Sequence, residues 1–146
     1  MKKSCSKINI IVVKNSDNNE RRFPMLVLKT ITVLPTLMRW RIETIRNVYG
    51  IEPEPRLLVA IRRYYREHVA EGSHVAFVAE VDGEECGCGA ISFTEELPSP
   101  DNPTGRCAYI TNIYVREAFR NKGIERDIVS LLMKEAESRG VGKIFF

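Results

Sequence analysis

The sequence predicts an α+β fold with one mixed, mostly antiparallel sheet flanked by helices. Two stretches with a helical period lie between two groups of β-prone runs. The pair Asp82-Gly83 joins two of those runs, and this dipeptide is a strong signal for an antiparallel hairpin. A strand, a turn, a helix and a final apolar run close the sequence, which is typical of a crossover connection. Runs of strands and helices in this order predict an α+β sheet.

The N-terminal part carries two β-branched runs, residues 8–13 and 25–33, separated by a polar stretch typical of a turn or loop. Each run predicts a strand. We therefore divide the chain into residues 1–24, an N-terminal extension or extra strand, and residues 25–146, one folded domain.

Two amphipathic helices are predicted next. Residues 34–49 carry apolar side chains at a 3.6-residue period, with Pro35 in the first turn and Gly50 as the stop. Residues 54–69 repeat that period and end before Gly72. The expected buried faces are Leu34, Leu37, Met38, Ile42, Ile45 and Val48 or Tyr49 in the first helix, and Leu57, Leu58, Ile61, Tyr64 or Tyr65 and Val69 in the second.

The second half of the chain alternates strands with turns and one helix. An antiparallel hairpin is the strongest local prediction, followed by a loop with three prolines, and loops of this length are often functional. The remaining β-prone runs flank a stretch with helical spacing. The expected elements are strands at residues 74–81 and 84–94, a loop at 95–105, a strand at 106–115, a helix at 123–139 and an apolar run at 141–146.

Composition narrows the class of protein. The chain has 146 residues, 44% hydrophobic content and a formal net charge of +3, which fits one ordinary globular domain. Its mild charge argues against a dedicated nucleic-acid binder but would favour a polyanionic small ligand. No apolar run approaches the roughly 20 residues that cross a bilayer, and no cleavage site follows the basic start. We expect no membrane partner and a cytoplasmic location.

The aromatic and arginine residues at 62–66 could indicate stacking on single-stranded nucleic acid. The helical period instead buries one of the tyrosines and leaves the arginines on a solvated face. Arg39 and Arg41 on either side of Trp40 follow the same pattern. We therefore expect no nucleic-acid partner, although a basic adaptor stays open as an alternative that salt-sensitive oligonucleotide binding would reveal.

The four cysteines are expected to be reduced thiols, because they are too sparse for a disulfide scaffold. Cys86 and Cys88 stand two apart in a predicted strand, so we expect their side chains on one face. A C-x-C pair without a nearby histidine is poor spacing for zinc, and no metal site is predicted.

The segment that carries chemistry runs from the predicted strand at 106–115 through residues 116–122 into the helix that opens at Gly123. A helix start leaves backbone N–H groups unpaired and favours anions by roughly 0.3 to 1 kcal/mol. Arg120 and Lys122 add two cations there, and Gly123 lets a phosphate approach the backbone. This combination suits a pyrophosphate.

Asn112-Ile113-Tyr114-Val115, followed by Phe119 to Glu125, resembles the acetyl-CoA signature of the GNAT superfamily, R/Q-x-x-G-x-G/A between a strand and a helix. The resemblance implies an acyl-CoA N-acyltransferase-like fold that binds acetyl-CoA as cosubstrate. It also implies transfer of an acetyl group to a primary amine of a small molecule or peptide. The implied cofactor-binding residues are Ile113, Tyr114, Val115, Arg120, Asn121, Lys122, Gly123, Ile124 and Glu125.

The family's chemistry implies direct attack of a neutral amine on the thioester. A backbone N–H of the strand at 106–115 would stabilise the oxyanion, with Ile113 and Val115 along the pantetheine arm. A general base must deprotonate the ammonium form of the acceptor to give that neutral amine. Candidates by position are Glu43, Glu80, Glu85 and Tyr109, while His68 and His74 are expected to be a helix-end charge and a strand-start polar residue.

Two departures from the family pattern affect function. Glu125 stands where the family has glycine or alanine, and its carboxylate is expected to weaken CoA binding. The family also continues past a final strand with another helix and two strands, which commonly supply a tyrosine that protonates the thiolate. We therefore expect an incomplete domain that forms homo-oligomers through its open sheet edge. A catalytically inactive CoA-binding or oligomerisation module is the alternative function.

Overall fold

The computed structural model describes residues 11–12 and 26–146. The predicted N-terminal extension, including Cys5, lies outside the described residues except for the two residues of its strand. The sheet has the order β1-β2-β3-β4-β5-β6, with antiparallel pairs up to β5 and a parallel pair β5–β6. Its strands are β1 (Ile11–Val12), β2 (Leu26–Ile31), β3 (His74–Val81), β4 (Glu84–Glu95), β5 (Arg106–Val115) and β6 (Lys143–Phe145).

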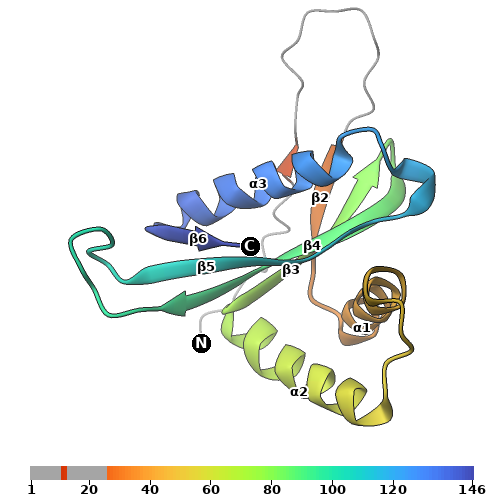
Figure 1. Ribbon diagram of the computed structural model, residues 1–146, viewed down its shortest axis with the longest axis horizontal. Helices are drawn as coiled ribbons and strands as arrows, with labels where there is room; N and C mark the ends of the chain where they lie inside the picture. Colours follow the sequence, from red (N-terminus) through yellow and green to blue (C-terminus); the bar gives the residue numbers. More distant parts are fainter. Residues whose placement is uncertain (1–10, 13–25) are drawn as a thin grey trace, which may run out of the picture.

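Helices cover both faces of the sheet, with α3 on one face and α1 and α2 on the other (Figure 1). The predicted fold class, a mixed and mostly antiparallel sheet flanked by helices, is confirmed. The helices are α1 (Leu34–Thr44), which continues as the π-helix η1 (Ile45–Tyr49), α2 (Pro55–Glu71), the 3₁₀ turn η2 (Glu117–Phe119) and α3 (Ile124–Ser138).

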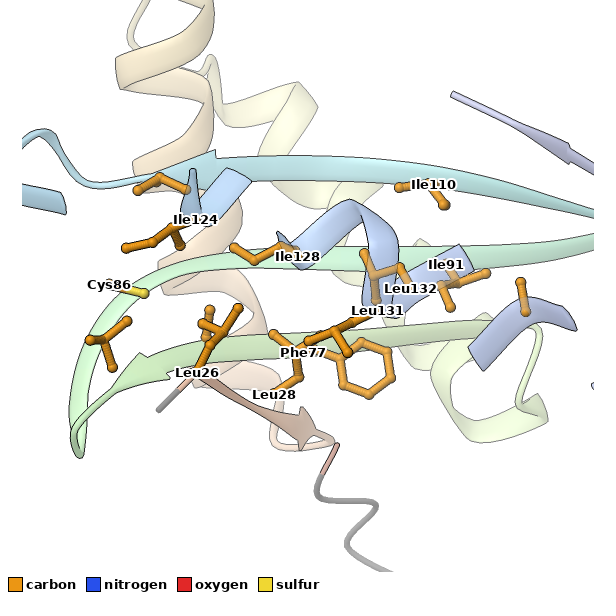
Figure 2. Close-up of a cluster of buried hydrophobic side chains, with 14 of the residues drawn as sticks. Leu26, Leu28, Phe77, Cys86, Ile91, Ile110, Ile124, Ile128, Leu131 and Leu132 are labelled. Carbon is orange, nitrogen blue, oxygen red and sulfur yellow. The ribbon is translucent and has the colours of Figure 1, made fainter. Parts of the chain in front are cut away.

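The core under α3 joins four strands to one helix. Leu28, Phe77 and Ile91 point from the sheet toward Ile128 and Leu132 of the helix, and all five are almost fully buried (Figure 2). Leucine, isoleucine and phenylalanine side chains buried in this way each contribute roughly 1.5 to 3 kcal/mol of transfer free energy. This core fixes α3, and therefore the start of α3, against the middle of the sheet.

The core on the other face contains a residue that the helical pattern did not predict. Trp40 is 2% exposed, whereas Val48 and Tyr49, the predicted end of the buried face, are more than half exposed. The reason is the π-helix at 45–49, whose wider turn rotates these residues off the 3.6-residue face. Tyr65 is the buried tyrosine of α2, and the predicted burial of Leu57 is wrong because this side chain is 41% exposed.

The prediction that Cys86 and Cys88 share one face is also wrong. Cys86 packs in the core under α3, and Cys88 packs in the core of the other face. The register between β3 and β4 shifts at Ala79 and Glu80, which indicates a β-bulge in the strand pair beside Cys86. A bulge adds one residue and reverses the alternation of side chains. Burial raises the pKa of both thiols to about 11.

Candidate functional site

A β-bulge interrupts β5 at Asn112. The register places Thr111 opposite Ala90 and Tyr114 opposite Cys88, so two residues of β5 face the single residue Gly89. Asn112 has φ of 55°, a left-handed conformation that asparagine tolerates better than most residues. The bulge bends the strand in its middle and changes the direction of the backbone that follows.

The edge of β5 that faces β6 loses its neighbour before the bulge. β6 pairs with β5 only from Cys107 to Tyr109, and beyond Tyr109 the described residues provide no strand on that edge. Backbone N–H groups of this edge are therefore available for a ligand from the bulge onward, whereas the Asn112 and Val115 carbonyls accept hydrogen bonds from Cys88 Sγ and Arg120 Nε.

The start of α3 leaves a row of backbone N–H groups open. Asp127 N–H donates to the Gly123 carbonyl at 3.1 Å, so the N–H groups of the preceding three residues have no intrahelical acceptor. No side chain caps them. Gly123 has φ of 76°, and a Cβ added there would meet nothing closer than the Arg126 side chain at 3.5 Å. The approach to this helix end is therefore open.

A cavity of about 510 Å³ lies at this helix start, and we call it the α3 cavity. Arg120 and Arg126 line it together with Asn121, whose φ is 63°. The Arg120 Nε atom donates to the Val115 carbonyl at 3.2 Å, which fixes the side chain beside the end of β5. Glu125 also lines the cavity, so its carboxylate shares the space with the two arginines.

The predicted cofactor-binding residues divide into two groups. Val115, Arg120, Asn121, Gly123, Ile124 and Glu125 line the α3 cavity. Ile113 packs into the core under α3, Tyr114 is buried on the opposite face of the sheet, and Lys122 lies 5.8 Å from the ring centroid of Phe119. These three side chains are not part of the lining, whereas Arg126, which was not among the predicted residues, is.

A second cavity of about 530 Å³ lies on the other face of the sheet, and we call it the α1–α2 cavity. Arg41 of α1, Tyr64 and Tyr65 of α2, and Thr111 and Asn112 of the bulge contribute to its wall. Burial raises the pKa of Tyr65 to about 12, so this phenol stays protonated. Because Thr111 and Asn112 line it, the cavity reaches β5 at the bulge.

A hydrogen-bonded cluster of neutral groups forms one side of the α1–α2 cavity. Tyr64 Oη lies 3.1 Å from His74 Nδ1 and 3.0 Å from Ser92 Oγ, and the last two atoms are 2.9 Å apart. Burial, followed by the charges of His68 and Arg41, lowers the pKa of His74 to about 4. The imidazole is therefore neutral at pH 7.

Two of the predicted base candidates are held by arginines. Both oxygens of Glu43 accept hydrogen bonds from Arg116 at 3.0 Å, and Glu85 lies 3.3 Å from Arg39. Glu80, the third carboxylate considered, pairs with Lys29 at 2.8 Å. None of these carboxylates lines either cavity.

Tyr109, the remaining candidate, has a different position. It lines the α1–α2 cavity, and its ring stacks on Phe145 with centroids 4.9 Å apart. Of the predicted candidates, Tyr109 alone contributes to the lining of a described cavity.

Sequence reasoning missed most of the α1–α2 cavity. Arg41 was expected on a solvated face, but its Nη1 donates to Asn112 Oδ1 at 2.8 Å and its side chain is half-buried. The sequence contains one signal of the bulge, which is Asn112. Asparagine is disfavoured inside a β-prone run, and it tolerates a left-handed backbone better than most residues. Nothing in the sequence pairs Arg41 with that asparagine.

A comparison with protein-family models identifies the family. The model described as the acetyltransferase (GNAT) family matches residues 34–146, which is most of the chain. The chain belongs to the GNAT acetyltransferase family. Acetyl-CoA is the cosubstrate of GNAT enzymes. A separate comparison with curated proteins found no match for this chain.

Solved GNAT structures have the same fold. A predicted acetyltransferase from Clostridium acetobutylicum, solved with acetyl-CoA, is 28% identical with a TM-score of 0.70, covering 82% of this chain and 79% of that chain. A GCN5-related N-acetyltransferase from Ralstonia eutropha is 22% identical with a TM-score of 0.64, covering 82% and 80%. Glucosamine-6-phosphate N-acetyltransferase from Arabidopsis thaliana is 18% identical with a TM-score of 0.58, covering 82% and 80%.

The residues of the α3 cavity fit the phosphates of acetyl-CoA. Unpaired N–H groups, a glycine with open space beside it and two arginines are groups of the kind that bind a pyrophosphate.

Among residues 11–12 and 26–146, no group of three histidine, cysteine or acidic side chains could hold a metal ion. In the same part of the chain, no helix has the length and apolar character needed to span a membrane.

Proposed function

We propose that the chain transfers the acetyl group of acetyl-CoA to a primary amine. The observation that carries this proposal is the position of the two cavities on one strand. Val115 of β5 lines the α3 cavity, and Thr111 and Asn112 of the same strand line the α1–α2 cavity. A thioester bound along the open edge of β5 from one side can meet an amine bound from the other at the bulge.

Different groups of the chain would bind the phosphates and stabilise the reacting thioester. The N–H groups at the start of α3, with Arg120 and Arg126, would bind the pyrophosphate. Backbone N–H groups on the open edge of β5 would donate to the thioester carbonyl oxygen as it gains charge, a contribution of about 3 kcal/mol per donor in comparable sites. Acetyl-CoA supplies an activated acetyl group whose transfer to an amine releases the CoA thiol.

The acceptor would occupy the α1–α2 cavity, where Tyr109 is the predicted base candidate that reaches the lining. Glu43 is fixed by two hydrogen bonds to Arg116, so we propose for it a role in positioning α1 against the end of β5.

The three described cysteines are free and buried, which supports a reducing compartment such as the cytoplasm.

Thiol release tests the proposal directly. The purified chain is incubated with acetyl-CoA and a panel of primary amines, and free CoA thiol is followed against a reaction without amine. CoA binding is measured separately by calorimetry. Amine-dependent thiol release with an acetylated product in the mass spectrum is the expected result. CoA binding without release for any amine would contradict it and would favour the catalytically inactive CoA-binding module.

A further inference from the structure

The charge of the α1–α2 cavity is one-sided. Within the described residues its lining contains no aspartate or glutamate, while Arg41 contributes a permanent positive charge. His74, which also lines the cavity, is neutral at pH 7 because its pKa is lowered to about 4. An acceptor that enters this cavity therefore meets one cation among neutral hydrogen-bonding groups.

Arg41 is held in place without being neutralised. Its Nη1 donates to Asn112 Oδ1 at 2.8 Å, and its guanidinium carbon lies 6.0 Å from the ring centroid of Tyr49. Arg39 and Arg46, on the same helical segment, each pair with a glutamate. Arg41 has no ion pair with any residue that the structure describes, and a guanidinium has five N–H donors. Most of its donors remain available to a ligand.

A half-buried charge without a counter-ion is unfavourable in an empty protein, because burial weakens its hydration. A ligand that brings a negative charge to Arg41 removes this penalty. The cluster beside it offers further polar contacts, since the hydroxyl groups of Tyr64 and Ser92 belong to residues of the lining. Charge and hydrogen-bonding capacity thus both point to an acidic, polar ligand.

We propose that the amine acceptor carries an anionic group, a carboxylate or a phosphate, and that Arg41 binds this group and selects the acceptor. The inference rests on the proposed acetyl transfer and names its substrate class. Arg41 contacts the bulge residue Asn112, so an anion bound by Arg41 lies beside the proposed reaction point. A polycationic amine would bring like charges to Arg41, and no carboxylate in the described lining would receive them.

Matched pairs of acceptors that differ in one charge test the inference. An amino acid is compared with its carboxamide, and glucosamine 6-phosphate with glucosamine, by kcat/KM from thiol release. The anionic member of at least one pair should exceed its neutral partner by about tenfold or more, as expected for a hydrogen-bonded charge pair. The pair that responds distinguishes a carboxylate from a phosphate.

Arg41→Gln should lower kcat/KM for the anionic acceptor by about tenfold, mainly through KM, and should lower kcat/KM for the neutral acceptor by a clearly smaller factor. Arg63→Gln is the matched control. Arg63 is an exposed arginine of α2 that pairs with Glu67, and its replacement should leave both acceptors unchanged. Equal turnover of neutral and anionic acceptors, or an equal loss for both in Arg41→Gln, would overturn the inference.

Binding separates this inference from the proposed function. If no amine is acetylated, the proposed function fails, and an N-acetyl amino acid and its amide are titrated into ¹⁵N-labelled protein with CoA present. The acid should shift the Thr111 and Asn112 amide signals, with about tenfold weaker affinity in Arg41→Gln. No shift with the acid, or equal affinities for acid and amide, would overturn the inference on its own. Melting curves verify that the variants are folded.

Discussion

The two cavities on either side of β5 differ in how the chain builds them. The α3 cavity comes from one continuous segment, Val115 to Val129, and its anion-binding groups are largely backbone N–H groups. The α1–α2 cavity takes residues from α1, α2, β3, β4 and β5. The first therefore depends on local conformation, and the second depends on tertiary packing.

This difference separates a task that backbone groups can perform from one that needs particular side chains. Backbone groups at a helix start bind phosphates whatever the surrounding side chains are, provided that the approach is open. Side chains such as Arg41, Tyr64 and His74 can recognise an acceptor only if several elements hold them in register. Perturbations that act on one region should therefore leave the other measurably intact.

The largest effect on stability is expected for a substitution at Gly87, where β4 pairs with the end of β5. A Cβ on Gly87 would lie 2.1 Å from the carbonyl oxygen of Tyr114, and this atom belongs to the backbone of β5. Gly87→Ala must therefore displace the end of β5, and we expect it to lower the free energy of unfolding by about 3 kcal/mol. Chemical denaturation measures this loss, with Thr94→Ala at the exposed end of β4 as control. Equal stability of the two variants would contradict the geometry.

A pH-dependent loss of stability should arise from the α1–α2 region. An unfolded histidine binds a proton below about pH 6.5, whereas folded His74 stays neutral down to about pH 4. Between these values the unfolded state holds more protons, so stability falls as pH falls. From pH 7 to pH 5 we expect a loss of about 2 kcal/mol that is missing in His74→Gln. Parallel pH profiles for the two proteins would refute the neutral, buried imidazole.

The affinity for CoA tests the α3 cavity. Arg120 lines the α3 cavity and is fixed by its hydrogen bond to the Val115 carbonyl. Arg120→Gln should weaken CoA binding by about tenfold, as for the loss of a charge-assisted hydrogen bond to phosphate. Calorimetry at low and at physiological salt measures the change. An unchanged affinity would show that the phosphates bind elsewhere.

The smallest expected effect tests the departure at Glu125. Its carboxylate is exposed and lines the α3 cavity, so it should repel the phosphates of CoA moderately. Glu125→Gln should tighten CoA binding roughly fivefold at low salt and less at high salt. Glu137→Gln, at the other end of α3, serves as control. If the two variants bind CoA equally well, the Glu125 carboxylate does not face the phosphates.

Local signals in the sequence were sufficient for most of the fold. Asp82-Gly83 predicted the β3–β4 hairpin, and the strand, turn and helix from Arg106 to Ser138 followed from β-propensity and helical period. The same locality explains why the α3 cavity could be predicted. Gly123 and Arg120 lie within one turn of the helix start, so their proximity needs no knowledge of the tertiary structure.

Two of the errors about buried side chains occurred where the backbone departs from a regular period. The π-helix moved Tyr49 to the surface, and a β-bulge separated Cys86 from Cys88, because an added residue changes the phase of every later side chain. The Arg41–Asn112 contact joins residues 71 positions apart. Spacing along the chain carries no information about such a pair.

We propose that backbone N–H groups at the start of α3 bind the linked phosphates of CoA. Amide chemical shifts of ¹⁵N-labelled protein, titrated with CoA and with pantetheine, test it most directly. We expect CoA to shift the amide signals of Gly123, Ile124 and Glu125, and pantetheine, which has no phosphate, to bind at least tenfold more weakly. Unmoved signals at these three residues, or equal affinity for pantetheine, would contradict phosphate binding at this helix start.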